Sequence, residues 1–333
     1  MTTKAGTDSK MSPSLQHFFF SLCLITSILT KLVTSQSQTQ LVGCETLGCS
    51  STGCTLGNAT NAFLGATSFN ANLPTSASSS ANQVELTWTV GALAQSPPQT
   101  SGSSSSTKDT LFTKNFYLGY SPTLNLASDS TGGCALFFEG IARSIPLNGS
   151  EYGSMTCQAA LGAQCVSDLL TQAERLVNSN SDTVCADLQS QMQPSPPSSC
   201  LGVAMVTWGS VVAKDLAQPQ PIPQTSCHPS VAGAGYDVAL IETQTVRSED
   251  VSSDLAPFFY SLTPVLSLFY SDTQTNSAKA YLSCLKVIDA AAGSVSTTTQ
   301  TSGALALTMG RVSTIHISSL TLAAMLVGVL GWP

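Results

Sequence analysis

Few residues in this chain are of types that could do chemistry by a known motif. A serine hydrolase needs a histidine base beside its nucleophile, and the 333 residues contain three histidines. His228 lies between Cys227 and Pro229 in a proline-rich stretch, and no G-x-S-x-G nucleophile elbow occurs. The H-E-x-x-H, phosphate-loop and G-x-G-x-x-G motifs are also absent. The sequence therefore contains no motif of a serine hydrolase, a metalloprotease or a nucleotide-binding enzyme.

Paired carboxylates are the remaining route to catalysis. A glycosidase places two carboxyl groups ~5 to 10 Å apart, and sequence separation does not constrain that distance. Three glutamates lie in apolar, strand-like contexts: Glu85, Glu139 and Glu242. Alternation places Glu85 on a solvated face, whereas Glu139 and Glu242 can point inward. Glu139 and Glu242 are the candidate catalytic pair, and the alternative is that they are ordinary carboxylates at strand ends.

Aromatic residues offer a second kind of site, because their rings can stack on sugars. The same side chains more often fill a hydrophobic core. The candidates are Trp88, Trp208, Phe137, Phe138, Phe258, Phe259, Tyr260, Phe269 and Tyr270. Coplanar, exposed rings would favour a sugar-binding module over a structural role.

The cysteines indicate an oxidising compartment. The chain has 11 cysteines, of which Cys23 falls in an apolar N-terminal run. The others are Cys44, Cys49, Cys54, Cys134, Cys157, Cys165, Cys185, Cys200, Cys227 and Cys284. An even number of cysteines in a secreted chain predicts disulfides. No C-x2-C pair occurs, so neither a metal site nor a cofactor is expected.

The N-terminus has the pattern of a secretory signal. Residues 18–29 form an apolar run, and Val33 and Ser35 supply small residues at positions −3 and −1 of a cleavage site. We therefore expect residues 1–35 to be removed and the mature chain to begin at Gln36.

The C-terminus has the layout of a glycosylphosphatidylinositol (GPI) attachment signal. A small-residue site at Ser302 is followed by a mixed spacer and an apolar run at 320–332. A membrane-spanning helix needs about 20 apolar residues, and this run is shorter, with no Lys or Arg after it. A tail anchor and a buried core helix are the alternatives. The prediction is attachment at Ser302, removal of 303–333, and a location on the extracellular face of the plasma membrane.

Charge and sequons limit the partners. The formal net charge is −7, which disfavours nucleic acid and anionic lipid headgroups. Sequons at Asn58 and Asn148 predict N-glycans on exposed loops. The expected partner is the outer leaflet of the plasma membrane, through the anchor.

Hydrophobic periodicity predicts a mainly β domain of the α+β class. Seven apolar strand segments are expected, at 83–90, 114–126, 134–141, 201–212, 236–246, 257–270 and 279–288. Helical spacing occupies 154–178 and 183–192, and the prolines that follow end it. We expect Pro264 to mark a bulge or an edge strand. The whole predicts a disulfide-bonded antiparallel β-sandwich-like domain with a short helical insert.

These features divide the chain into five parts. After the signal peptide at 1–35, a Cys-rich N-terminal segment at 36–82 is stapled to the main body by at least one disulfide. The β-rich ectodomain spans 83–289, with its helical insert at 154–192. A Ser/Thr/Ala-rich stalk at 290–302 precedes the attachment signal at 303–333.

Several short strings carry a family resemblance. They are FYLGYSP at 116–122, CALFF at 134–138 and LSCLK at 282–286, together with the stalk and the GPI signal. With these, the chain resembles the GPI-anchored surface proteins of filamentous ascomycete fungi, a group without assigned activity. The resemblance implies a plasma-membrane or cell-wall location, adds cell-wall polysaccharide as an expected partner, and brings no catalytic residues.

The functional expectation follows from these parts. We expect a non-enzymatic, GPI-anchored cell-surface or cell-wall protein that acts in wall structure, adhesion or recognition. The alternative is a wall-remodelling, carbohydrate-active enzyme that uses Glu139 and Glu242 as its paired carboxylates.

Overall fold

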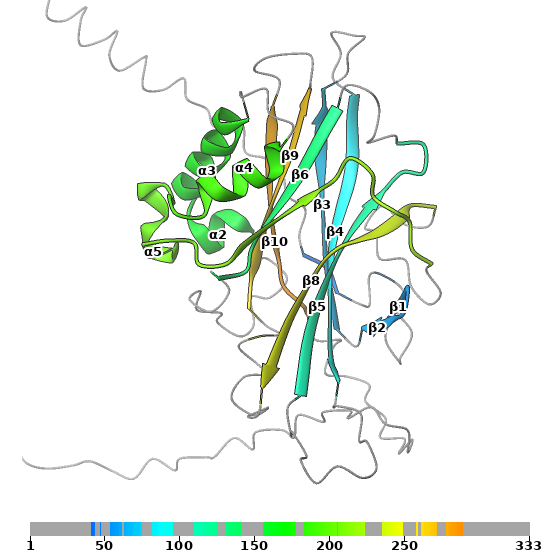
Figure 1. Cartoon of the computed structure of the whole chain (residues 1–333). Coiled ribbons are helices and arrows are strands. Elements are labelled where there is room, and N and C mark those ends of the chain that lie inside the picture. Colours follow the sequence, from blue (N-terminus) through cyan, green and yellow to red (C-terminus); the bar gives the residue numbers. More distant parts are fainter. Residues whose placement is uncertain are drawn as a thin grey trace, which may run out of the picture.

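The chain folds as a sandwich of two antiparallel sheets, seen in a computed structural model (Figure 1). The described residues are 41–43, 47, 54–61, 63–74, 82–95, 110–124, 131–140, 156–177, 183–204, 206–223, 235–248, 258, 261–271 and 278–288. Helices cover the outer face of one sheet, and a small hairpin lies against the other. This confirms the predicted mainly β, disulfide-bonded fold.

The first sheet contains four strands in the order β3-β4-β5-β8. They are β3 (Phe63–Leu73), β4 (Asn82–Gln95), β5 (Thr110–Tyr120) and β8 (Asp237–Ser248). Strand β3 was not predicted, although it pairs with β4 along its whole length. Most of its side chains are buried on both faces, so the sequence lacks the apolar–polar alternation that indicates a half-exposed strand.

The second sheet has the order β10-β9-β6-β7. Its strands are β6 (Thr131–Phe138), β7 (Val211–Asp215), β9 (Thr263–Ser271) and β10 (Lys279–Leu285). The expectation of an edge strand or a bulge at Pro264 was wrong, because β9 lies inside the sheet in unbroken register with both neighbours. Pro264 pairs with Cys284 and precedes Val265, the first residue paired with β6. Its missing N–H therefore falls at the end of a ladder, where proline is tolerated.

Helices form the outer layer of the second sheet (Figure 1). They are α2 (Cys157–Leu161), α3 (Ala163–Leu176), α4 (Val184–Met192) and α5 (Leu201–Ala204), with a 3-10 turn at Ser198–Cys200. Gly162, at φ 88°, separates α2 from α3 and so divides the predicted helix at 154–178.

The predicted strand at 201–212 was wrong in its first half. Residues 201–204 are helical, and β7 begins only at Val211. The Cys165–Cys200 disulfide holds the start of this segment against α3. Trp208 is buried with its ring 4.9 Å from that of Phe138, which places it under the helical layer. Tertiary contacts therefore override the β-branched composition of the segment.

Three disulfides connect the described layers. Cys165–Cys200 lies within the helical layer, Cys134–Cys185 joins β6 to α4, and Cys157–Cys284 joins the start of α2 to β10. Cys54 of β1 (Cys54–Leu56) is also disulfide-bonded. Its partner lies outside the described residues, because the other described cysteines pair with one another; Cys44, Cys49 and Cys227 lie there too.

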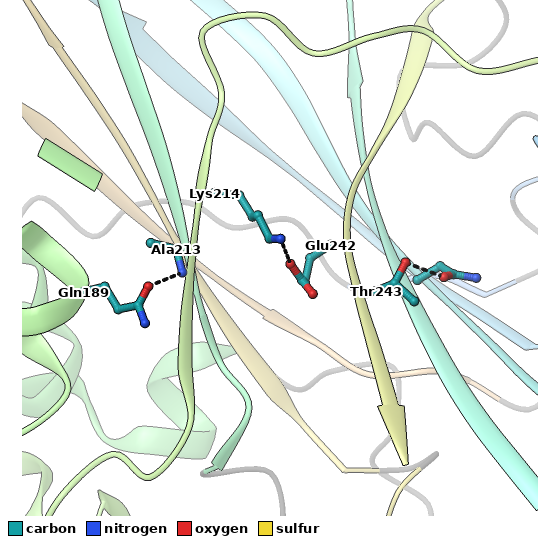
Figure 2. Close-up of polar contacts among 6 residues, drawn as sticks. Gln189, Ala213, Lys214, Glu242 and Thr243 are labelled. Atoms are coloured by element: carbon teal, nitrogen blue, oxygen red, sulfur yellow. Dashed lines mark hydrogen bonds and ion pairs between the residues drawn. The ribbon is translucent and has the colours of Figure 1, made fainter. Parts of the chain in front are cut away.

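Helix side chains cap both edges of the second sheet. The Glu174 carboxylate of α3 accepts a hydrogen bond from the Ala280 backbone N–H of β10, at 3.2 Å. The Gln189 side-chain oxygen of α4 accepts one from the Ala213 N–H of β7, at 3.0 Å (Figure 2). Capping an edge N–H in this way blocks pairing with a strand of another chain.

The outer face of the first sheet is covered by the hairpin of β1 and β2 (Ala59–Asn61). Asn61, fully buried, donates to the hydroxyl of Tyr117 on β5 at 3.2 Å. A Cβ at Gly91 would lie 2.4 Å from the Asn61 side-chain oxygen, so only glycine allows this close approach. The hairpin therefore belongs to the packed domain.

Candidate functional site

Four charged side chains from four strands meet on one side of the space between the sheets. Lys114 belongs to β5, Glu139 follows β6, Lys214 belongs to β7 and Glu242 belongs to β8. Strand alternation and register turn all four toward the other sheet. We call Lys114, Glu139, Lys214 and Glu242 the charged cluster.

An ion pair joins the edges of the two sheets. The Lys214 Nζ lies 2.7 Å from the Glu242 Oε2, and Figure 2 shows the two side chains pointing toward each other. The lysine is 42% exposed, whereas the glutamate is only 9% exposed. The contact is an ion pair and not a well-directed hydrogen bond. A nearly buried carboxylate is thus neutralised by a cation that reaches in from solvent.

Lys114 is the most deeply buried member of the cluster. Its ammonium group donates to the Ser261 backbone oxygen at 3.1 Å and to the Ser261 hydroxyl at 2.8 Å. It also lies 5.0 Å from the centre of the Phe258 ring. Burial lowers the Lys114 pKa from 10.5 to about 7, and the nearby Glu139 opposes that shift. Lys114 therefore changes between its charged and neutral forms near neutral pH.

A serine beside a lysine of lowered pKa is one known arrangement of nucleophile and base. Here the Ser261 hydroxyl donates to the Phe258 carbonyl at 2.8 Å and accepts from Lys114. Its proton points at a carbonyl and not at the amine, and the residue is 4% exposed. The contact therefore links Lys114, Ser261 and the Phe258 carbonyl and does not activate a nucleophile.

Glu139 is half-buried at the end of β6. Burial raises its pKa from 4.5 to about 7, and the charge of Glu242 raises it further. A hydrogen bond from Ser210 and the charges of Lys114 and Lys214 act in the opposite direction. Within the part of the chain that the structure describes, the Glu139 Oε1 has no hydrogen-bond partner. Glu139 is thus a carboxyl group that can hold a proton near neutral pH.

The structure brings the two candidate carboxylates close enough to interact, because the charge of Glu242 raises the pKa of Glu139. Glu85 lies elsewhere, on the outer face of the first sheet, where β4 pairs with β3. A catalytic role for the pair remains a prediction. Sequence reasoning missed both lysines of the cluster. Lys114 was missed because β5 begins at Thr110, four residues earlier than predicted, which makes Lys114 an inward-facing position in mid-strand.

The other predicted sites are only partly described. Asn58 is exposed at the turn between β1 and β2, and Thr60 of the same sequon is exposed on β2. Asn148, His228 and the attachment residue Ser302 lie outside the described residues.

The candidate sugar-binding aromatics are mainly core residues. Tyr270 is half-buried, and Phe259 and Tyr260 lie outside the described residues. The buried ones are Trp88, Trp208, Phe137, Phe138, Phe258 and Phe269. They pack in tilted or edge-to-face pairs, as in Trp88 with Phe137 at 5.5 Å between ring centres. The described aromatics therefore make no flat, exposed platform.

Two other kinds of site are absent from the described residues. No three His, Cys, Asp or Glu side chains there are arranged to hold a metal ion. No helix within those residues is long and apolar enough to cross a bilayer.

Comparison of the chain with protein families, curated proteins and solved structures gives no match. The function therefore has to be argued from the chain's own residues and from the chemistry of the charged cluster.

Proposed function

We propose that this chain is a non-enzymatic, GPI-anchored protein of the cell surface or cell wall, acting in wall structure, adhesion or recognition. Its resemblance to the surface proteins of filamentous ascomycete fungi motivates the choice of a walled cell. The ectodomain is the sandwich, and the anchor would join it to the outer leaflet of the plasma membrane through Ser302.

The disulfides are the observation that carries this proposal. Two of the three described bridges tie helices to strands of the sandwich, and the third closes the helical layer on itself. Such bridges persist in oxidising compartments and are rare in the cytosol. The exposed position of Asn58 supports the same address, because a glycan there would extend from the tip of a hairpin.

The pairing within the charged cluster supports a role without catalysis. Glu242 is nearly buried and faces Lys214, while the Lys114 ammonium group donates hydrogen bonds to the Ser261 backbone oxygen and hydroxyl. Charged groups that are paired inside the fold stabilise its packing. A protein that is only displayed on a surface requires no catalytic group. The described aromatics fill the core in the same way.

Release from intact cells tests the anchor. Phosphatidylinositol-specific phospholipase C should move the protein from the cell surface into the medium, because it cuts the lipid from a GPI anchor. A variant that lacks 320–332 should reach the medium without the enzyme. Protein that stays on the cell after complete digestion of a GPI-anchored marker would contradict the proposal.

The carbohydrate-active enzyme is the second candidate, and one observation favours it. Glu139 has a pKa of about 7, raised by burial and by the charge of Glu242, as a general acid beside an ionised carboxylate requires. In that reading Glu139 would protonate the leaving oxygen and Glu242 would act as nucleophile or base.

Incubation with wall polysaccharide separates the two candidates. The non-enzymatic protein should leave glucan and chitin intact, whether or not it binds them. The enzyme should release soluble sugar, and Glu139→Gln and Glu242→Gln should each abolish release. Glu85→Gln is the matched control, since Glu85 is a half-buried strand glutamate outside the cluster.

A further inference from the structure

An ion pair crosses the open side of the sandwich. Strand β7 is the edge of the second sheet and pairs with β6, and strand β8 is the edge of the first sheet and pairs with β5. Lys214 of β7 and Glu242 of β8 make this ion pair (Figure 2). The 237–239 end of β8 is held in addition by the backbone after β7, where Pro221 pairs with Ala239 and the Ile222 N–H donates to the Val238 carbonyl at 2.8 Å. We call this side of the molecule the β7–β8 seam.

The charged groups that face the seam come from every strand around it. Lys114 enters from β5, Glu139 from the end of β6, and Lys214 and Glu242 from the two edges. The other charges on the edge strands point away from it. They are Asp215, which accepts from the Ala217 N–H at 2.6 Å, and Arg247, which pairs with Leu111. The exception is Asp237 at the start of β8, which lies on the inner face beside Tyr120, five residues before Glu242.

Proton loss changes the balance of these groups. Below neutral pH the Glu139 carboxyl is protonated and Lys114 is charged, so the cluster holds two ammonium groups and one carboxylate, that of Glu242. Above neutral pH Glu139 is ionised and Lys114 is neutral, because both pKa values lie at about 7. Two carboxylates then share the single ammonium group of Lys214. The attraction across the seam weakens as the repulsion between the carboxylates grows.

We propose that the charged cluster is a proton-sensitive clasp, which holds the β7 and β8 edges together below neutral pH and loosens them above it. The proposal goes beyond the cell-surface function and does not depend on it. The geometry fits a local change: the ion pair lies on two edge strands and has one solvent-reaching partner, so the seam can open while the inner strands stay paired.

Hydrogen exchange on the intact protein measures the seam directly. The full chain is produced in a secretory host and purified as that host processes it. Amide exchange is followed by mass spectrometry at about pH 6 and about pH 8, with the intrinsic pH dependence of exchange removed. We expect protection in β7 and in the 242–248 half of β8 to fall about tenfold between the two conditions, while β9 and β10 stay unchanged.

Two variants distinguish a charge-dependent opening of the seam from a loss of stability throughout the domain. Glu139→Gln removes the second carboxylate and should keep the seam protected at the higher pH. Lys214→Met removes the solvent-reaching cation and should leave the seam weakly protected at both. Their matched controls are Glu85→Gln, half-buried, and Lys279→Met, exposed on the edge strand β10 of the same sheet. Both controls should behave like the wild type.

The same experiment can overturn the proposal. Equal protection of the wild-type seam at both pH values would do so. A loss that Glu139→Gln reproduces in full would also do so, because the carboxyl group would then play no part. Circular dichroism of each variant establishes that it is folded, and Lys214, being 42% exposed, tolerates replacement without a buried cavity.

Discussion

The space between the two sheets has two unlike halves. An apolar cluster drawn from both sheets, which includes Trp88 of β4 and Phe137 of β6, forms the first. The charged cluster, toward the β7 and β8 edges, forms the second. In the first half the Trp88 indole N–H donates to the Ser267 hydroxyl at 2.8 Å, so even the polar atom is satisfied. In the second half the Glu139 Oε1 has no described hydrogen-bond partner.

This difference separates stability from pH response. Apolar burial contributes ~25 cal/mol per Å² and does not depend on pH. Buried charges cost free energy unless they are paired, and that cost changes when a group gains or loses a proton. The apolar half should therefore set how stable the domain is, and the charged half should set how stability varies with pH.

Loss of Trp88 should have the largest effect. Trp88→Ala removes a fully buried indole that packs edge-to-face on Phe137, so the free energy of unfolding should fall by about 3 to 5 kcal/mol. Urea denaturation measures it. Leu240→Ala, at a residue 45% exposed, is the control and should cost less than about 0.5 kcal/mol. A Trp88 effect no larger than the control would mean that this half is not the stabilising core.

Removing Lys114 should abolish the alkaline part of the pH dependence. A folded-state pKa lowered from 10.5 to about 7 means that Lys114 releases its proton more readily in the folded protein. Stability should therefore rise from pH 7 toward 10.5, by about 1 kcal/mol per pH unit, and fall again as pH returns to 7. Lys114→Met should flatten that rise in denaturation curves, and Lys279→Met should keep it. An unchanged slope in Lys114→Met would refute the assignment.

Loss of the seam cation should cost less. Lys214→Met leaves the nearly buried Glu242 carboxylate without its ion pair, and we expect a loss of about 1 kcal/mol at pH 7, because Lys214 is 42% exposed and screened by water. Urea denaturation against Lys279→Met measures the difference. Adding the Glu242→Gln change to Lys214→Met should recover most of the loss, and failure to recover it would show that packing and not charge is responsible.

Glu139 should give the smaller of the two pH slopes, on the acid side. Its folded-state pKa is raised from 4.5 to about 7, so its contribution is present below 4.5 and is lost as pH rises through 7. We expect the wild type to lose about 0.5 kcal/mol per pH unit in this window, reduced by solvent screening at a half-buried group. Glu139→Gln should lack that slope, whereas Glu85→Gln should retain it. Identical slopes in both variants would exclude Glu139 as the source.

The fold class was predictable because the strongest sequence signals survive in the structure. The alternation around Trp88 correctly predicted part of β4, and the helical spacing around Leu169 correctly predicted α3. Strand β3 could not be found in this way, since both of its faces are covered. The segment at 201–204 was misread because the Cys165–Cys200 disulfide, and not local propensity, decides its conformation.

The candidate site was only half predictable. Glu139 and Glu242 stood out because a carboxylate in an apolar strand is unusual, and the structure brings them into one cluster. Lys114 is more than 70 residues from Glu242 along the chain, and Lys214 is more than 70 residues from Glu139. The pairing of β5 with β8, the pairing of β6 with β7 and the packing of the two sheets bring these residues together, and no spacing along the chain encodes that arrangement.

Mass spectrometry of the C-terminus tests the central claim most directly. Cell-associated protein is isolated from the organism's own surface and digested, and the last peptide is sequenced. The account predicts that the chain ends at Ser302 and carries a GPI glycan there. A cell-associated chain that still ends in Trp332 and Pro333 would contradict it.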